Sequence, residues 1–133
     1  MIIKIEYPPN YEDIKRAFKL DGSQVFCYGD VLYNPNNHTV PEHLLVHERV
    51  HEAQQTGFFM NPKKWWKRYI EDPQFRLYQE VEAYQEQFKF ISTEVKDKNT
   101  LLKLKTLIAK ELSGPMYGNM VGYTEAFDLL DSQ

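Results

Sequence analysis

Residues 41–55 of the chain read PEHLLVHERVHEAQQ. Proline is favoured at the first position of a helix, and Gly57 stands just beyond the end of this stretch, where glycine commonly follows a helix. The stretch therefore predicts a helix over 41–55, with Thr39 or a near neighbour as its cap.

Within this helix, His47, Glu48 and His51 form the pattern H-E-x-x-H. Histidines four positions apart lie one above the other on one face of a helix, so both imidazoles can reach one metal ion. Glu48 is rotated by about 100° from His47, beside such an ion rather than on it. The pattern predicts a Zn2+ ion held by His47 and His51, with Glu48 as the base that activates a zinc-bound water. The alternative is a surface helix with two solvated histidines.

His43 extends the histidine spacing by one more turn. His43 and His51 are about 12 Å apart along a helix axis at 1.5 Å per residue, whereas zinc–nitrogen bonds are about 2.0–2.1 Å long. Three histidines on one helix therefore cannot share the ion. His43 is expected at the surface or behind a ligand, and His38 in a loop.

A catalytic zinc needs a third protein ligand and one open position for water. The stretch 73–94 has apolar residues at helical spacing and carries Glu80, Glu82 and Glu86. Glu80 falls on the flank of the apolar stripe, whereas Glu82 and Glu86 are turned away from it. Glu80 is therefore the expected third ligand and Glu82 the reserve candidate, while an ordinary solvated glutamate at position 80 is the alternative.

The region before residue 41 has the patterns of a small sheet. Alternating residues predict a strand over 2–7, and the apolar runs 25–28 and 31–33 are separated only by Gly29-Asp30, a good hairpin turn. Asn10 is the expected cap of a short helix through about Leu20.

The region after residue 55 has helical patterns. We expect a short helix from Pro62, a long one over 73–94, another over about 99–112, and a last one near 124–131. The fold class is therefore α+β, with a small N-terminal sheet or hairpin followed by a mainly helical body, in a single domain over 1–133.

Composition limits the classes of partner and the compartment expected for the chain. The net charge is −3, which gives no reason to expect nucleic acid or an anionic membrane as a partner. The stretch 63–68 mixes basic and aromatic residues, as nucleic-acid or membrane-surface patches do, and a helix with one buried Trp and a cationic outer face explains it equally well. A lone cysteine, Cys27, fits a reducing compartment and is expected in the core. With no secretion signal and no apolar run of membrane-spanning length, a cytoplasmic protein is expected.

At this point the sequence resembles a known class. His47-Glu48-Arg49-Val50-His51 followed by Glu80-Val81-Glu82-Ala83-Tyr84 is similar to the gluzincins, zincins with two histidines and a glutamate. The short length resembles the minigluzincins and small phage-encoded metallopeptidases. In membrane-embedded relatives the glutamate stands in an E-x-x-A-D pattern, which Glu80 and Ala83 match. Tyr84 departs from it, since the family has an aspartate there that steadies a ligand histidine.

The resemblance adds further expectations. A zincin edge strand binds an extended peptide, and 31–33 is the expected edge strand here. By analogy with minigluzincins, the tail 113–133 is a candidate cover of the cleft. Independently, a phenol can stabilise an oxyanion, and Tyr84, Tyr117 and Tyr123 are the candidates. Gln54 and Gln55 either line the cleft or are solvated.

Together these features predict a zinc-dependent metallo-endopeptidase that acts on a peptide or protein substrate through a water activated by Glu48. A catalytically silent zinc-binding interaction module, for example a phage assembly protein, is the alternative. A metal-dependent hydrolase of another bond is a third possibility.

Overall fold

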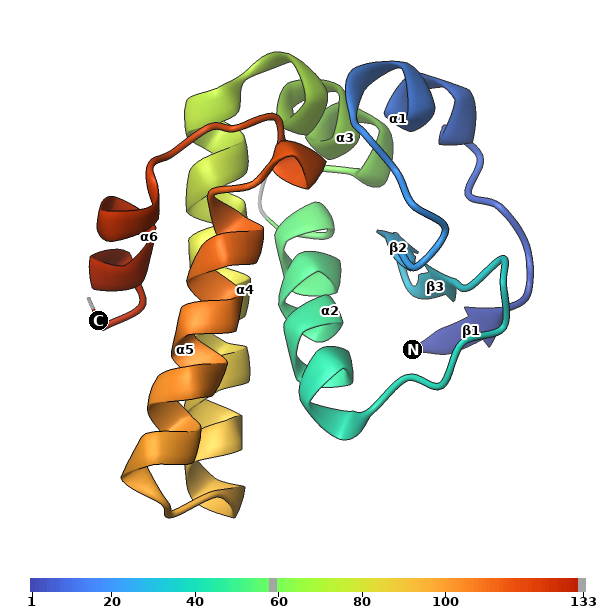
Figure 1. The fold of residues 1–133 in the computed structure, drawn as a ribbon. Helices are drawn as coiled ribbons and strands as arrows, with labels where there is room; N and C mark the ends of the chain where they lie inside the picture. Colours follow the sequence, from blue (N-terminus) through green and yellow to red (C-terminus); the bar gives the residue numbers. More distant parts are fainter. Residues whose placement is uncertain (58–59, 132–133) are drawn as a thin grey trace.

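The computed structural model describes residues 1–57 and 60–131 of the chain. Within these ranges the fold is α+β, which confirms the expected class. The elements are β1 (Ile2–Lys4), α1 (Tyr11–Ala17), β2 (Phe26–Tyr28), β3 (Val31–Tyr33), α2 (Glu42–Gln55), α3 (Pro62–Glu71), α4 (Pro73–Glu94), α5 (Lys98–Leu112), the 3-10 turn η1 (Pro115–Tyr117) and α6 (Tyr123–Leu129). Figure 1 shows α4 and α5 as a long pair on one side, with the small sheet on the other.

The sheet has the strand order β1-β3-β2, with β1 parallel and β2 antiparallel to β3. Gly29 opens the β2–β3 turn with a φ of 63°, so the predicted hairpin is confirmed. The prediction that 31–33 forms an edge strand is wrong, because β1 pairs with its other side. Sequence patterns locate strands but do not fix which strands become neighbours.

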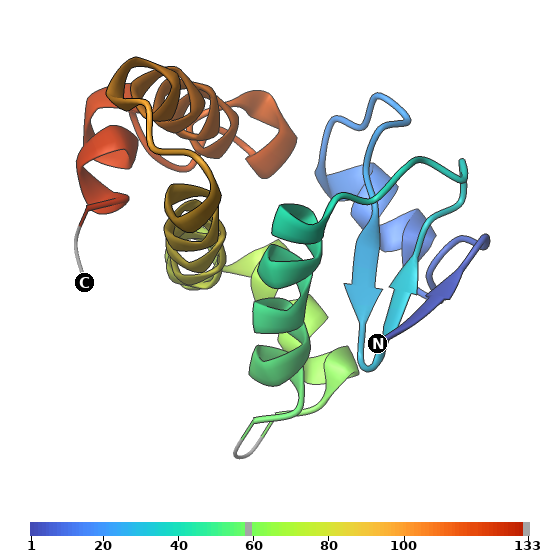
Figure 2. The ribbon, with the colours of Figure 1, turned by 90° about the horizontal axis from the view of Figure 1, so that it is seen from below.

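Helix α2 stands between the sheet and α4. It contacts β2 on one side and α4 on the other, while α5 and α6 continue the stack beyond α4. Figure 2 shows this succession from the sheet through α2 and α4 to α5 and α6. The helix carrying the H-E-x-x-H pattern is therefore an interior element rather than a surface one.

The helix boundaries follow local capping chemistry. The side chains of Asn61, Asp72 and Asp97 accept backbone N–H groups at the starts of α3, α4 and α5. The expected cap at Thr39 is wrong, since Pro41 occupies the cap position of α2. Asn10 precedes α1 without a side-chain cap bond, and α1 ends at Ala17 rather than near Leu20.

Two apolar clusters flank α2. One joins α4, α5 and α6 around Leu77, Val81, Tyr84, Ile108, Ala109, Leu112, Ala126 and Leu130. The other joins α1, β2 and α3 around Ile14, Phe26, Trp65, Trp66 and Tyr69. Both tryptophans of α3 are buried, so the expectation of one buried Trp is wrong, whereas Cys27 is a core residue as expected.

The tail 113–131 is packed into the fold, and residues 132–133 of the expected tail lie outside the described residues. Ala126 and Leu130 are buried in the first cluster. Gly118 follows η1 with a φ of 80°, and a Cβ there would lie 3.1 Å from the Arg76 guanidinium. None of the helices in the described ranges combines the length and apolar character that a membrane crossing requires.

Two leucines of α5 test this assignment of the core. Leu112 is 0% exposed and Leu102 is 54% exposed. Leu112→Ala is expected to lower the free energy of unfolding by about 2–5 kcal/mol, because it leaves a cavity in a packed cluster. Leu102→Ala should change it by less than about 0.5 kcal/mol. Urea unfolding followed by circular dichroism measures both, and equal effects would contradict the assignment.

Candidate metal centre

The buried face of α2 is made of polar side chains. This helix buries four residues: His47, Glu48, His51 and Gln55. A helix in a protein interior normally buries an apolar stripe, because burying a polar group costs free energy unless it is paired. Such a face therefore points to a site rather than to packing alone.

Glu80 of α4 meets the two histidines of α2. The Nε2 atoms of His47 and His51 lie 3.2 Å apart. Glu80 Oε1 lies 3.2 Å from Nε2 of His47, and Glu80 Oε2 lies 3.2 Å from Nε2 of His51. The ligand atoms that the three residues offer lie within 4.8 Å of one another, and all three side chains are buried. The group could hold a metal ion.

The orientation of His51 is fixed by Gln54. The Gln54 Nε2 donates to the backbone oxygen of Gln79 at 3.0 Å and to the Glu82 carboxylate at 2.9 Å, and both partners only accept. Gln54 Oε1 must therefore face His51 Nδ1, at 2.8 Å, and accept its proton. With Nδ1 as the donor, the Nε2 of a neutral His51 directs a lone pair into the cluster.

His47 is held from α4 in a comparable way. Its Nδ1 lies 2.9 Å from Oε1 of Gln87, whose Nε2 lies 2.9 Å from Nδ1 of His43. His43 is thus behind a ligand, as expected, and His38 lies in a loop where it contacts the Gly22 carbonyl. Gln87 orients His47, a role for which the family resemblance had pointed to position 84.

These contacts test whether the group fits a metal ion. When both rings are neutral and donate through Nδ1, their two Nε2 atoms carry only lone pairs and cannot hydrogen-bond to each other at 3.2 Å. Glu80 Oε1 is buried and has no hydrogen-bond partner among the described residues. Two imidazole nitrogens and a carboxylate oxygen that converge in this way fit a divalent transition-metal ion.

The electrostatics of the metal-free cluster of His47, His51 and Glu80 also fit a bound cation. Burial acts to lower the pKa of His51, but the Glu80 carboxylate outweighs it and raises the pKa to about 9. Burial acts to raise the pKa of Glu80, yet the charge of His51 and the close imidazoles of both histidines hold it well below its usual range. A proton on His51 thus balances the carboxylate, and a cation would take its place.

The other glutamates of α4 are not in the cluster. Glu82 is exposed and accepts the Gln54 amide, so it supports His51 from outside. Glu86 pairs with Lys89 at 3.6 Å. The structure brings Glu80, and not the reserve candidate Glu82, to the two histidines.

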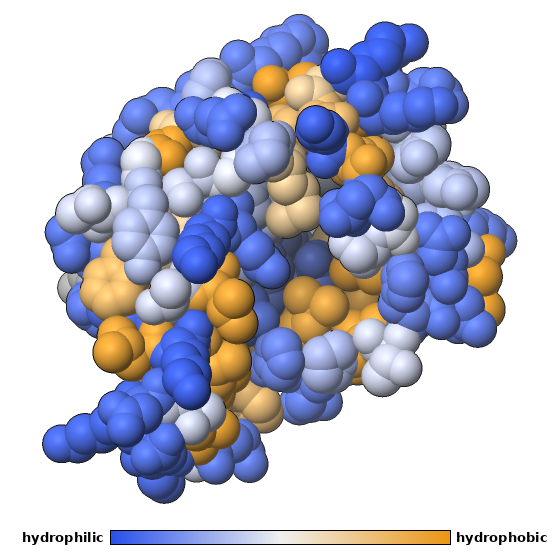
Figure 3. Space-filling model, viewed as in Figure 1, coloured by the Kyte–Doolittle hydropathy of each residue, from blue (hydrophilic) through white to orange (hydrophobic). Residues whose placement is uncertain are grey.

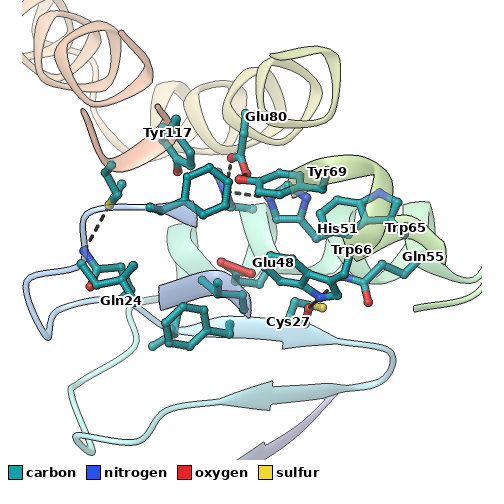
Figure 4. Close-up of a pocket in the computed structure, with 17 residues that line it drawn as sticks. Gln24, Cys27, Glu48, His51, Gln55, Trp65, Trp66, Tyr69, Glu80 and Tyr117 are labelled. Atoms are coloured by element: carbon teal, nitrogen blue, oxygen red, sulfur yellow. Dashed lines mark hydrogen bonds and ion pairs between the residues drawn. The ribbon is translucent and has the colours of Figure 1, made fainter. Parts of the chain in front are cut away.

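Glu48 lies beside the cluster and faces a cavity of about 80 Å³ that His47, His51 and Glu80 also line. Figure 4 shows Glu80, Tyr69 and Tyr117 on one side of His51, with Glu48 and Cys27 on the other. Burial raises the pKa of Glu48, the two histidines act to lower it, and Glu80 raises it further. Figure 3, viewed from the same side as Figure 1, shows the molecular surface hollowed near its middle.

The three tyrosines that were candidates for stabilising an oxyanion occupy different positions. Tyr117 lines the cavity, and its hydroxyl lies 2.7 Å from that of Tyr84. Tyr84 packs edge-on against His47 at 4.4 Å and donates to Glu111 at 3.0 Å. Tyr123 is 42% exposed at the start of α6, and the cavity lining within 1–57 and 60–131 does not include it. Of the tail, Met116 and Tyr117 of η1 border the cavity, and its inhibitory role stays a prediction.

Two further buried residues line the cavity: Gln55, for which the sequence left the cleft and solvent open, and Tyr69, which was not predicted. Gln55 is 0% exposed, and it donates to the Cys27 carbonyl at 2.8 Å and accepts the Gly29 N–H at 2.7 Å, which fastens α2 to the hairpin. Tyr69 donates to Glu80 Oε2 at 2.6 Å. A polar residue one turn after His51 was a usable signal for Gln55, whereas the sequence carried none for Tyr69.

Glu80 and Glu82, both on α4, provide a test of which carboxylate binds the metal. Glu80→Gln is expected to lower metal affinity by at least about 100-fold, because an anionic ligand is lost. Glu82→Gln should change it less than about tenfold. Metal content of the purified variants and competition with a chromophoric chelator measure this. Equal affinity in the wild type and Glu80→Gln would exclude Glu80 as a ligand.

The pH dependence of metal binding tests whether His51 holds a proton in the metal-free protein. His51 has a pKa of about 9 in the metal-free protein, so a metal ion displaces a proton at lower pH. Raising the pH removes this competitor, and affinity should rise about tenfold per pH unit between about pH 6 and pH 8. Chelator competition at constant ionic strength measures the slope, and a flat profile would contradict the prediction.

No protein-family model, curated protein or solved structure matched this chain in comparisons with known proteins. The chemistry of the site therefore has to be inferred from its own residues.

Proposed function

We propose that the chain is a zinc-dependent endopeptidase in which His47, His51 and Glu80 hold the ion and Glu48 is the general base. The observation that carries this proposal is the position of Glu48: a fourth buried ionisable group that lines the same cavity as the three ligand residues. A site that held metal for stability alone would have no use for an additional carboxylate there.

The environment of Glu48 suits proton transfer. A general base works best when its pKa lies near the operating pH, and burial moves the Glu48 pKa upward from its ordinary value. When bound, zinc would lower the pKa of a water to about 7 and polarise a carbonyl. Glu48 would accept a proton from the attacking water and pass it to the leaving amine.

A peptide is the substrate class that the surrounding structure supports. β2 is an outer strand of the sheet on the side of α2, and Val25, Phe26 and Cys27 line the cavity. An extended chain can add to such an edge through backbone hydrogen bonds. The Cys27 carbonyl already accepts from Gln55 and Trp66, so the edge before Cys27 is the part left for a substrate.

Tyr117 is the phenol best placed to meet a developing oxyanion, because it lines the cavity and, unlike Tyr69, does not donate to Glu80. Tyr84 would act through it. Tyr84 donates to the Glu111 carboxylate, so the Tyr84 oxygen accepts the single Tyr117 proton in the substrate-free protein, and Tyr117 would turn this hydrogen bond from Tyr84 to the oxyanion.

A catalytically silent metal-binding module is the second candidate. The low exposure of the ligands favours it: His47 is 3% exposed, His51 5% and Glu80 3%. Ligands so enclosed are also typical of ions that stabilise a fold.

The conservative change Glu48→Gln separates the candidates. Cleavage of a peptide library by the zinc-loaded protein is expected to fall about 10²–10⁴-fold, because the amide cannot accept a proton. The zinc content should be unchanged. Glu52→Gln, one turn further along α2, is the matched control and should retain activity. Mass spectrometry of the products provides the measurement.

Each result has a distinct meaning. Zinc binding with no cleavage by the wild type would favour the silent module. Cleavage that survives Glu48→Gln would remove Glu48 from the mechanism. Absence of zinc binding by the wild type would overturn both candidates.

A further inference from the structure

Tyr69 makes the two oxygens of Glu80 unequal. Its hydroxyl donates to Glu80 Oε2 at 2.6 Å. Glu80 Oε1 lies 3.2 Å from His47 Nε2 and has no hydrogen-bond partner among the described residues. Oε2 also lies 3.2 Å from His51 Nε2, so the two oxygens differ in the phenol: Tyr69 engages Oε2, whereas Oε1 keeps its lone pairs for the space between the histidines.

The phenol is held rigidly. The Tyr69 ring is stacked on Trp65, with centroids 4.8 Å apart and an interplanar angle of 22°. Trp66 and Phe18 contact it edge-on at 5.1 Å and 5.8 Å. The backbone carbonyl of Tyr69 accepts the Arg76 guanidinium at 2.8 Å, which ties the end of α3 to α4. The hydroxyl therefore reaches Glu80 from a fixed position.

The number of carboxylate oxygens on the metal decides whether a position stays open. Two histidines and one oxygen make three bonds, which leaves the fourth position of a tetrahedral ion for water. A second oxygen from the same carboxylate would crowd or fill that position. A hydrogen bond to Oε2 competes with this second bond, because it uses one of the two lone pairs of that oxygen and withdraws negative charge from it.

We propose that Tyr69 is a positioning residue that limits Glu80 to one metal bond, through Oε1, and so keeps a coordination position open beside Glu48. The inference rests on the proposed metal centre. It does not require that the substrate be a peptide, because any reaction at this site needs the open position.

The first test is a crystal structure of the zinc-loaded wild-type protein. Glu80 Oε1 should lie about 2.0–2.2 Å from zinc, with Tyr69 still bonded to Oε2 and a solvent molecule as the remaining ligand. Both Glu80 oxygens within bonding distance of zinc, or a Tyr69 hydroxyl turned away, would overturn the proposal.

The second test uses Co2+ in place of zinc, since its visible absorption is stronger in four-coordinate than in five-coordinate sites. Tyr69→Phe removes only the hydroxyl. It is expected to weaken Co2+ binding by about 10–100-fold and to reduce the absorption per bound ion, as Glu80 binds through both oxygens. Tyr11→Phe is the matched control, because Tyr11 packs against the same aromatic cluster from α1. It should keep the wild-type spectrum and affinity.

The outcomes separate this inference from the proposed function. A wild-type spectrum in Co2+-loaded Tyr69→Phe would refute the role of Tyr69 and leave the metal centre intact. Failure of the wild type to bind Co2+ or zinc would refute the centre itself. Loss of stability shared by both phenylalanine variants would appear in thermal unfolding of the metal-free proteins, while the zinc-loaded wild-type structure still decides the coordination.

Discussion

The polar face of α2 has to be buried against α4, and the surrounding structure is arranged to satisfy it. Two imidazoles and a carboxylate face one another across this contact, and each would cost free energy if it were left without a partner. Gln54 and Gln87 hold the outer nitrogens of the rings, and Tyr69 holds one oxygen of Glu80. Among the described residues, Glu80 Oε1 at the centre of the cluster keeps no hydrogen-bond partner, and a cation could be held there.

The two apolar clusters on either side of α2 hold the helices around the site rigidly in place. One backs α4 with α5 and α6, and the other packs α3 against α1 and the sheet. Arg76 links them, because its guanidinium binds the carbonyls of Tyr69 and Tyr117, and Gln55 fastens α2 to the β2–β3 hairpin. The two histidines of α2 and the glutamate of α4 are held in place in this way, so little reordering would oppose the binding of a metal ion.

The same arrangement separates the roles of chemically similar residues. Glu80 and Glu48 are both buried carboxylates, but Glu80 is paired with two histidines and has a lowered pKa, whereas the pKa of Glu48 is raised by burial. Environments that push the pKa values of two carboxyl groups apart in this way are typical of sites in which one carboxyl binds a metal and the other acts as a base. Tyr69, Tyr84 and Tyr117 also differ in their contacts: Tyr69 donates to Glu80, Tyr84 packs on His47, and Tyr117 lines the cavity beside Tyr84.

The sequence by itself determined the α+β class, the helices and the proximity of His47 to His51, because helical periodicity and capping act over a few residues. It also favoured Glu80 over Glu82, since a helical wheel tells which side of α4 is buried. It could not determine that β3 is the central strand, that Gln87 supports His47, or that Tyr69 reaches Glu80. These relations join residues far apart in the chain, and only the packing of α2, α3 and α4 decides them. Local patterns place a residue on a face, whereas tertiary contacts decide what that face meets.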